Sequence, residues 1–474
     1  MQIHVSSEIG TLRRLLVHSP DSGLGKVVPS KAQDWLFEDI VHLDTMRREE
    51  YDYYLKILLY FLDPDKVKGK LATIDADEER TFFKPEHPNF YNSDKVIEVQ
   101  KLLADFLENK EIHDQLIASV CAIERCTMQT QNQLLGLPSI ELAKTLISGT
   151  LPDGKMIFPP VPNLIFTRDI GITINHHVLL NKPAKQARTR EALLAKYIFF
   201  YHQMFAENRD KIVEIPENEH HFLMPDEEKD AVRTTLEGGD VMMVAPNHLL
   251  IGVSERTTVQ AAQQAIKALF ERNVLDKVTV VKIPKKRDYM HIDTVFTQVK
   301  RNMWVLLGTI ARNDQHFADP VVSSLLDKNA ATEQVKIVQF RKGEQPEVIE
   351  HLEDLLRQIS MEDFDCRRDE VKFVYSGNNE FPYGAREQWT DSCNLLALRE
   401  GVVVGYDRND KTLAAFRALG FRTVRAKDLL EEFEAGISAP ESLSDTFIML
   451  PSAELSRARG GSHCMSMPIL RDKV

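Results

Sequence analysis

Long hydrophobic runs are absent from this sequence. No stretch approaches the roughly 18 consecutive apolar residues that a membrane-spanning helix needs. Residues 1–14 also lack the apolar core and the cleavage site of a secretory signal peptide. We therefore expect a soluble protein without a membrane partner.

Cysteine is scarce and shows no pairing pattern. There are five cysteines and no CxxC motif; they are Cys121, Cys126, Cys366, Cys393 and Cys464. An odd number of sparse cysteines is typical of reduced thiols in a cytoplasmic protein, not of a disulfide framework. Cys121 and Cys126 fall in a helical-looking stretch and are predicted to belong to the core, not to a metal site.

Basic residues are outnumbered, with 59 Lys and Arg against 71 Asp and Glu and a formal net charge of −12. A general nucleic-acid binder needs a net basic face to neutralise phosphates, so we expect no nucleic-acid partner. A local basic pocket for a carboxylate is still compatible with this charge. The length of 474 residues, with 43% hydrophobic and 27% charged residues, predicts a globular protein of two to three domains.

Four segments share one plan, which is a β-rich run, a short turn and a second β-rich run. The turns contain Asn, Gly or Pro, so each segment is predicted to be a β-hairpin. The segments are residues 170–180, 241–251, 295–307 and 395–405. A fifth unit is expected to combine Leu12–His18 with a C-terminal strand around Cys464. Repeated strand, hairpin and helix units predict a closed, pseudosymmetric ring.

Helical periodicity follows several of these hairpins. Ser254 is predicted to cap a helix over residues 255–272. A second helix is marked by Leu413, Phe416 and Leu419 and is expected to end at Gly420.

Two segments interrupt the repeat. Residues 75–150 lack hairpin signals and carry apolar residues at helical spacing, so we predict a helical domain over 75–150 inserted into a catalytic α/β domain of residues 1–74 and 151–474. The charged stretch 342–370 is predicted to be a surface elaboration. Its apolar residues are placed on one helix; they are Val348, Ile349, Leu352, Leu355 and Leu356.

Two acidic clusters lie next to the first two hairpins. If residues 163–169 are extended, Asn163 and Asp169 share one face, where a carboxylate could bind a cation; an Asp at a strand end is more often a turn cap. Two glycines separate Glu237 from Asp240 and let the backbone approach a ligand closely, so that both acids face a cleft. The alternative is a Gly-Gly turn with solvated acids.

A histidine, an acid and two arginines add to this set. On a strand, His291 and Asp293 share one face, which suits a general acid/base beside a cation-binding group, a metal site or a surface pair. Arg188 and Arg256 follow the first and second hairpins. Arginine binds carboxylates bidentately, although a lone arginine is by default a solvated surface charge.

Cys464 follows Gly460-Gly461-Ser462-His463 and precedes an apolar tail. A cysteine alone is more often a buried hydrophobe than a nucleophile. A cysteine, a histidine and several carboxylates spread over the repeat units describe a ring with an acidic centre. Acids bind a flat cation such as a guanidinium, and a thiolate can attack its central carbon.

These motifs closely resemble those of the arginine deiminases, in the guanidino-modifying (pentein) superfamily. The resemblance covers most of the chain and rests on ordered motifs at residues 7–10, 37–40, 166–169, 236–240, 291–294, 386–389 and 460–468. It implies an α/β fold, namely a five-fold pseudosymmetric α/β propeller with a helical insertion. It also implies a homo-oligomer and no metal or organic cofactor.

The resemblance assigns five catalytic residues. Cys464 matches the nucleophile and His291 the general acid/base. Asp169 and Asp293 match the residues that hold the guanidinium nitrogens, and Glu237 lies at the same end. The implied reaction forms an amidino-thioether, releases ammonia and yields citrulline after attack by water.

The resemblance assigns five further residues to substrate binding. Asn163, Arg188 and Arg256 match residues that hold the α-carboxylate of the substrate. Phe166 matches a residue that packs on its aliphatic part, and Arg459 matches a mobile arginine near the nucleophile. A guanidino substrate with a free carboxylate, arginine foremost, is therefore expected.

The chain departs from the family pattern at several places. Ser462 replaces a glycine, Ile170 stands where some deiminases have proline, and residues 216–233 and 342–375 are extra. The alternatives are an arginine dihydrolase that yields ornithine, ammonia and carbon dioxide, or an amidinotransferase of the same superfamily. Outside this class stand a metallohydrolase, which would use His291, Asp293, Glu237 and Cys464 or His463, and a non-catalytic pentein binding protein.

Overall fold

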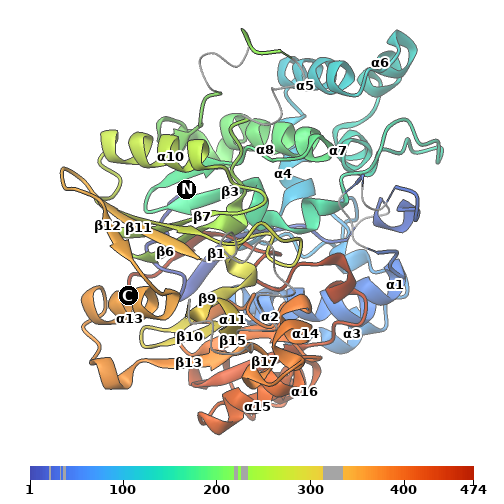
Figure 1. Cartoon of the computed structure of the whole chain (residues 1–474). Coiled ribbons are helices and arrows are strands. Elements are labelled where there is room, and N and C mark those ends of the chain that lie inside the picture. The colour runs from blue at the N-terminus through green and yellow to red at the C-terminus, as the bar shows by residue number, and fades with distance from the viewer. Residues whose placement is uncertain (21–22, 32–33, 36–38, 218–222, 226–232, 313–334) are drawn as a thin grey trace.

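The computed structural model describes residues 1–20, 23–31, 34–35, 39–217, 223–225, 233–312 and 335–474. Within these residues, backbone hydrogen bonds join the strands into five sheets, and helices lie toward the outside (Figure 1). The protein is therefore a mixed α/β structure, as the sequence predicts. Residues 37–38 and most of the extra segment 216–233 lie outside the described residues.

The five sheets share one pairing pattern. Two strands pair antiparallel, and one of them also pairs in parallel with a third strand. The sets are β3 (Gly171–Ile174), β4 (His177–Leu180) and β5 (Ile212–Val213); β6 (Val241–Ala245), β7 (His248–Val253) and β8 (Lys277–Lys282); β9 (Phe296–Lys300), β10 (Met303–Leu306) and β13 (Lys372–Tyr375); β14 (Leu396–Arg399), β15 (Val402–Tyr406) and β17 (Thr446–Leu450); and β18 (Met467–Arg471), β1 (Leu12–Val17) and β2 (Val96–Glu98).

Helices occupy the connections that lead to the parallel strands, because a parallel pair requires a crossover. The crossover helices are α2 (Asp52–Leu62), α8 (Thr189–Tyr201), α10 (Val259–Glu271), α13 (Leu352–Glu362), α15 (Asp410–Ala418) and α16 (Ala426–Glu434). Short helices complete these links; they are α1 (Leu43–Thr45), α3 (Leu71–Asp75) and α11 (Gly308–Ala311), whereas α14 (Tyr383–Trp389) lies between β13 and β14. Their apolar faces pack on the sheets, as Ala262 and Leu269 of α10 do in one buried cluster with Leu249 and Ile251 of β7.

The predicted hairpins are confirmed, including the fifth unit from the two ends of the chain. β1 and β18 pair antiparallel, and β18 begins three residues after Cys464. The backbone N–H of His4 donates to the carbonyl of Ile469 at 2.9 Å, so a second N-terminal segment also joins this sheet. At the hairpin turns, Asn175 and Gly401 have φ of 50° and 75°, a region that asparagine and glycine tolerate.

One predicted helix end is confirmed and one is wrong. α15 stops at Ala418, and Gly420 follows with φ of 90°. Ser254 does not cap α10, because the helix begins at Val259 and the Thr258 side chain accepts the N–H of Ala261. Thr258 has the same capping chemistry as Ser254 but lies directly before the apolar stripe. The Ser254 hydroxyl instead accepts the N–H of Arg256.

The single helix predicted within residues 342–370 is wrong in its first part. Val348 and Ile349 lie in β12 (Glu347–Ile349), which pairs with β11 (Lys336–Arg341) and extends the sheet of β8. Val348 is 75% exposed whereas Ile349 is buried, because successive side chains of a strand point to opposite faces. The other three apolar residues of the prediction do lie on α13 and are buried.

Residues 75–150 are mainly helical. They contain α4 (Val99–Phe106), α5 (Lys110–Ile123), α6 (Met128–Leu135) and α7 (Ser139–Ser148), and α5 and α6 lie at one edge of the molecule (Figure 1). The same segment contains β2, which pairs in parallel with β1. The division of the chain into a catalytic and an inserted domain stays a prediction.

Two further features concern the described helices and the cysteines. No helix in the described part of the chain is long and apolar enough to span a bilayer. All five cysteines have free thiols. Cys121 is buried in a core cluster and Cys126 packs against it, as predicted from their helical context.

Candidate active site

Four of the turns that lead into the five hairpins line one buried cavity. Four turns contribute lining residues, which are Asp169 before β3, Glu237 before β6, His291 before β9 and Cys464 before β18. The turn before β14 brings Asn394 to Cys464, whose backbone N–H it accepts at 3.0 Å. Equivalent positions of the repeat thus bring a carboxylate, an imidazole and a thiol to one site.

The cavity gathers nearly all of the predicted site residues. Every one of them except Asp293 lines it; these are Asn163, Phe166, Asp169, Arg188, Glu237, Arg256, His291, Arg459 and Cys464. Met290, Thr294 and Ala458 complete the lining. The cavity volume is about 30 Å³, enough for one or two water molecules. A substrate the size of an amino acid therefore requires side chains to move.

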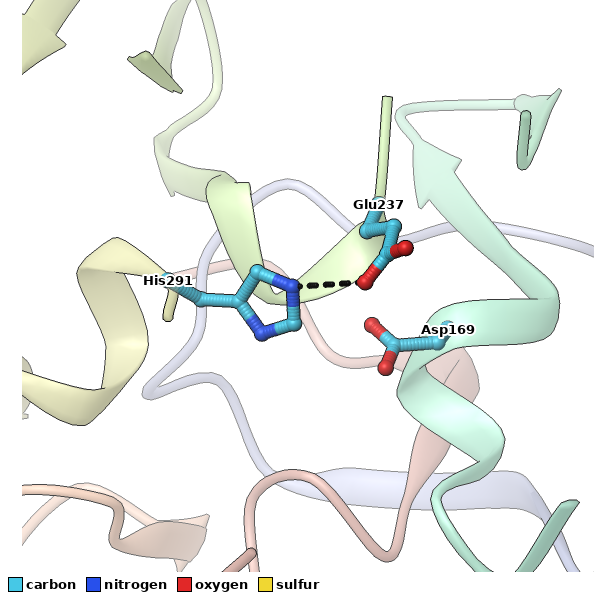
Figure 2. Close-up of side chains that lie close together, drawn as sticks. All are labelled: Asp169, Glu237 and His291. Carbon is cyan, nitrogen blue, oxygen red and sulfur yellow. Dashed lines mark hydrogen bonds and ion pairs between the residues drawn. The ribbon is translucent and has the colours of Figure 1, made fainter. Parts of the chain in front are cut away.

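Asp169, Glu237 and His291 form the acidic side of the cavity (Figure 2). Nε2 of His291 lies 3.0 Å from Oε2 of Glu237. Oδ1 of Asp169 accepts the N–H of Gly239 at 3.0 Å. A Cβ at Gly239 would lie 2.5 Å from Nδ1 of His291, so glycine is required there for the imidazole to pack on the backbone. Gly239 thus makes room for a protein side chain.

These carboxylates control the charge of His291. Burial alone lowers the pKa of the imidazole, but the charge of Asp169 and the hydrogen bond to Glu237 outweigh it and raise the pKa to about 10. His291 is therefore a cation at neutral pH, with a proton to donate.

Arg188 is bound by three carboxylates. Its Nη1 lies 2.7 Å from Oδ2 of Asp169 and 3.3 Å from Oε2 of Glu237, and its Nε donates to Glu191 at 3.1 Å. These acids raise the pKa of Arg188 well above its usual range, against the effect of burial. Arg188 was expected to hold a substrate carboxylate, and here its guanidinium lies at the predicted guanidinium-binding acids.

The same cluster is the one group of potential metal ligands found among the described residues. Ligand atoms of Asp169, Glu237 and His291 lie within 4.8 Å of one another. The guanidinium of Arg188 already bonds two of these three side chains, and His291 carries a proton at neutral pH. A metal ion requires a neutral imidazole and free carboxylates, so this donor set fits an organic cation better than a metal.

Cys464 lies beside Asp293, which is fully buried behind the cavity. The Cys464 thiol donates to Oδ2 of Asp293 at 3.5 Å, and the same oxygen lies 2.9 Å from Nδ1 of His463. Nε2 of His463 lies 3.2 Å from Oε2 of Glu8, so both ring nitrogens face carboxylates. Burial, together with the charges of Asp293 and Asp169, raises the pKa of the Cys464 thiol well above its usual range.

Two further arginines, Arg256 and Arg459, also line the cavity. Nη2 of Arg256 donates to Sδ of Met290 at 3.5 Å, and its Nη1 lies 3.9 Å from Oε1 of Glu237. The guanidinium of Arg459 stacks on the ring of Trp389, 3.4 Å from its centroid. Asn163 donates to the carbonyl of Trp35 at 2.8 Å. The ring of Phe166 packs so closely on Gly460 that a Cβ there would lie 2.4 Å away.

The backbone of the site differs from the sequence analysis in two places. An extended form was considered for residues 163–169, but they form two 3-10 turns, Pro162–Ile165 and Thr167–Ile170. His291 and Asp293 were placed on one face of a strand, but a 3-10 turn begins at Ile292. The turn points His291 into the cavity and Asp293 toward His463. The alternation of side chains along a strand therefore does not apply to these residues, because they lie in tight turns.

Several residues of the site were missed. Glu191 binds Arg188 from one turn further along the chain, a spacing typical of helical ion pairs. Trp389 holds Arg459, and Asn394 holds Cys464. Asn394 could have been found from the repeat, because the other four hairpins are also preceded by a polar residue of the site.

Substituting glutamine for Glu237 should lower the pKa of His291. Glutamine keeps the shape and a hydrogen-bond acceptor but removes the charge, so we expect the pKa to fall from about 10 by roughly one unit or more. The fraction of protonated His291 at pH 9 falls accordingly. NMR titration of imidazole resonances measures the change, with His248 as internal reference; an unchanged pKa contradicts the electrostatic assignment.

The sequence is similar to those of known proteins along its whole length. A family model described as "Arginine deiminase" matches residues 124–471. The chain is 30% identical to the arginine deiminase of Borrelia recurrentis over 100% of this chain and 98% of that protein. It is also 30% identical to the arginine deiminase of Streptococcus gordonii, over 100% of this chain and 99% of that protein. Among solved structures it is similar to an amidinotransferase from Microseira wollei, with a TM-score of 0.46 and 10% identity over 100% of this chain and 98% of that one.

Proposed function

Because the chain belongs to the arginine deiminase family and hydrolyses arginine to citrulline and ammonia, we propose that Cys464 is the nucleophile of this reaction. The observation that carries the proposal is the convergence of Cys464, His291, Asp169 and Glu237 on one buried cavity. A thiol, a protonated imidazole and two carboxylates are the groups needed to bind and attack a guanidinium.

Binding of the substrate cation activates the thiol. Asp169 and Asp293 hold the guanidinium nitrogens, and Glu237 keeps His291 protonated beside them. Oδ1 of Asp293 is buried with no hydrogen-bond partner among the described side chains, which supports a role as an acceptor for the substrate. The carboxylates that raise the thiol pKa are neutralised when the cation binds, so Cys464 loses its proton to solvent.

The first half of the reaction forms the covalent intermediate. The Cys464 thiolate attacks the guanidinium carbon and gives a neutral tetrahedral adduct. His291 donates its proton to one amino group, and the C–N bond breaks to release ammonia. The product of this half is a cationic amidino-thioether on Cys464, with His291 neutral.

The second half releases citrulline. Neutral His291 takes a proton from water, and the hydroxide attacks the same carbon. The C–S bond breaks, the thiolate is restored, and the hydroxyl proton leaves so that the carbonyl of the ureido group forms. Ammonia and this proton together account for the ammonium released per arginine.

Arg188 changes partners when substrate binds. We place the α-carboxylate between Arg188, Arg256 and Asn163, whereas Arg188 in this structure contacts Asp169 and Glu237. The incoming guanidinium competes for those two acids and carries the same charge. Glu191 bonds the other edge of Arg188 and retains it near the cavity during this exchange.

Arg256→Ala should raise the KM for arginine by about 10- to 100-fold, the value of one charged hydrogen bond to the carboxylate. Agmatine has the same guanidinium without the carboxylate, so its kcat/KM should hardly change. The ratio of kcat/KM for the two substrates measures the effect. Arg425→Ala, at an exposed pair with Asp428, is the matched control. If the ratio is the same as in wild type, Arg256 does not bind the α-carboxylate.

Product analysis tests the end point directly. Incubation with arginine followed by chromatography should give citrulline and ammonia in equal amounts. Ornithine with carbon dioxide indicates a dihydrolase, and an amidino-amine formed with an added amine indicates an amidinotransferase.

Three wider features belong to the same proposal. The shared pairing pattern of the five sheets supports a five-fold α/β propeller with residues 75–150 as its helical insertion. Five free thiols support a reducing, cytoplasmic location. Assembly into a homo-oligomer is tested by light scattering of the purified protein.

A further inference from the structure

Asn394 connects the turn that carries Cys464 to the turn that carries Asp293, and the proposed mechanism gives it no role. It lies in the turn before β14, the fourth hairpin, and is fully buried. Its Oδ1 accepts the backbone N–H of Cys464 at 3.0 Å, and its Nδ2 donates to the carbonyl of Asp293 at 3.1 Å. One side chain therefore links the backbone of the cysteine to the backbone of the carboxylate that its thiol contacts.

The two hydrogen-bond partners determine the orientation of the Asn394 amide group. A backbone N–H can only donate and a backbone carbonyl can only accept, so the oxygen must face Cys464 and the nitrogen must face Asp293. Asparagine supplies one acceptor and one donor at this spacing. Aspartate lacks the donor when ionised, and alanine lacks both.

The backbone of Asn394 extends the same connection. Its carbonyl accepts the N–H of His463 at 3.4 Å and the hydroxyl of Ser462 at 3.4 Å. A Cβ at Gly461 would lie 2.7 Å from this carbonyl, so the cysteine turn packs directly on Asn394. Ser462 also donates to the carbonyl of Val404 at 2.6 Å, which ties the turn to β15. The serine that departs from the family pattern thus holds the same turn.

We propose that Asn394 is a positioning residue that sets the distance between the Cys464 sulfur and the guanidinium held at Asp293. This inference rests on the proposed role of Cys464. Asn394 does not line the cavity, so it acts through Cys464 and Asp293.

Loss of either hydrogen bond lets the two turns separate. A displacement of about 1 Å between reacting atoms can lower a rate by roughly 100-fold. The substrate contacts at Arg256 and Asp169 are intact, so kcat falls by about that factor while KM changes by less than about threefold.

The experiment compares Asn394→Ala, Asn394→Asp and Asn409→Ala with the full-length wild type. Asn409 is a matched control, because it is also buried and its side chain bonds both polar groups of Thr390 away from the cavity. We expect kcat to fall by about 100-fold in both Asn394 variants and to stay near wild type in Asn409→Ala. The rate at which iodoacetamide alkylates Cys464 can be followed by mass spectrometry at several pH values. We expect the pH dependence of this rate to change in the Asn394 variants and to stay as in wild type in Asn409→Ala.

Asn394→Asp adds a signature that general destabilisation cannot produce. A protonated carboxyl group regains the donor that ionised aspartate lacks, so this variant should recover activity as the pH falls, relative to wild type. A wild-type kcat in both Asn394 variants overturns the inference, as does an equal loss in Asn409→Ala. If Cys464→Ala still forms citrulline, Cys464 is not the nucleophile, and the positioning role of Asn394 is then contradicted as well.

Discussion

Cys464→Ala should lower kcat for citrulline formation by at least ~10⁴-fold, because no other group can form the covalent intermediate. Among the described residues, Cys464 is the one cysteine that lines the cavity with His291. The substitution removes only a sulfur atom from a buried position, so the fold should persist. A coupled ammonia assay and chromatographic detection of citrulline measure the loss.

Cys366→Ala is the matched control for this experiment. Cys366 is half-buried, does not line the cavity, and its thiol donates a hydrogen bond to the carbonyl of Phe364. The control should retain full activity. Cys464→Ala should still bind arginine, since the carboxylates are untouched, and calorimetry can show this. Residual citrulline formation above 1% of wild type would assign the attack to another nucleophile.

The hairpins could be predicted because their signals are local. Alternating β-branched runs and Asn or Gly turns define two paired strands without help from the rest of the chain. The strands that pair in parallel with these hairpins could not be predicted from local signals. β2 and β5 are short, and their pairing with β1 and β4 depends on packing across residues distant in sequence.

The residues of the site could be predicted from the sequence, but the backbone geometry that positions them could not. The motifs marked Asp169, Glu237, His291 and Cys464, and the structure gathers them around one cavity. Their backbone was misread because 3-10 turns have no sequence period as plain as that of a strand or helix. Asn394 was missed because it lies before an ordinary hairpin and carries no charge.

The charges around the cavity set the ionisation of both His291 and Cys464. The acids raise the pKa of His291 to about 10 and also raise that of the Cys464 thiol. The free site thus holds a thiol and an imidazolium, a poor nucleophile beside a ready acid. In the proposed mechanism, a guanidinium bound at Asp169 and Asp293 lowers the pKa of the Cys464 thiol and so favours the thiolate that attacks it.

His291→Ala should lower kcat for arginine by about 10³-fold, because the leaving ammonia needs a proton and the attacking water must lose one. The KM should change less, since the carboxylates that hold the guanidinium remain. His248→Ala is the matched control, because His248 is equally buried and bonds Asp363 and Thr279 far from the cavity lining. Steady-state kinetics with arginine measure both variants.

An isothiourea analogue of arginine separates the two tasks of His291. Its leaving group is a thiolate, which departs without a proton, so the first half of the reaction should proceed in His291→Ala. The second half still requires a base for water, and the amidino-thioether should therefore accumulate on Cys464. Mass spectrometry of the intact protein detects this adduct, which wild type should clear. If no adduct forms, or if the variant turns the analogue over like wild type, His291 is not the group that transfers both protons.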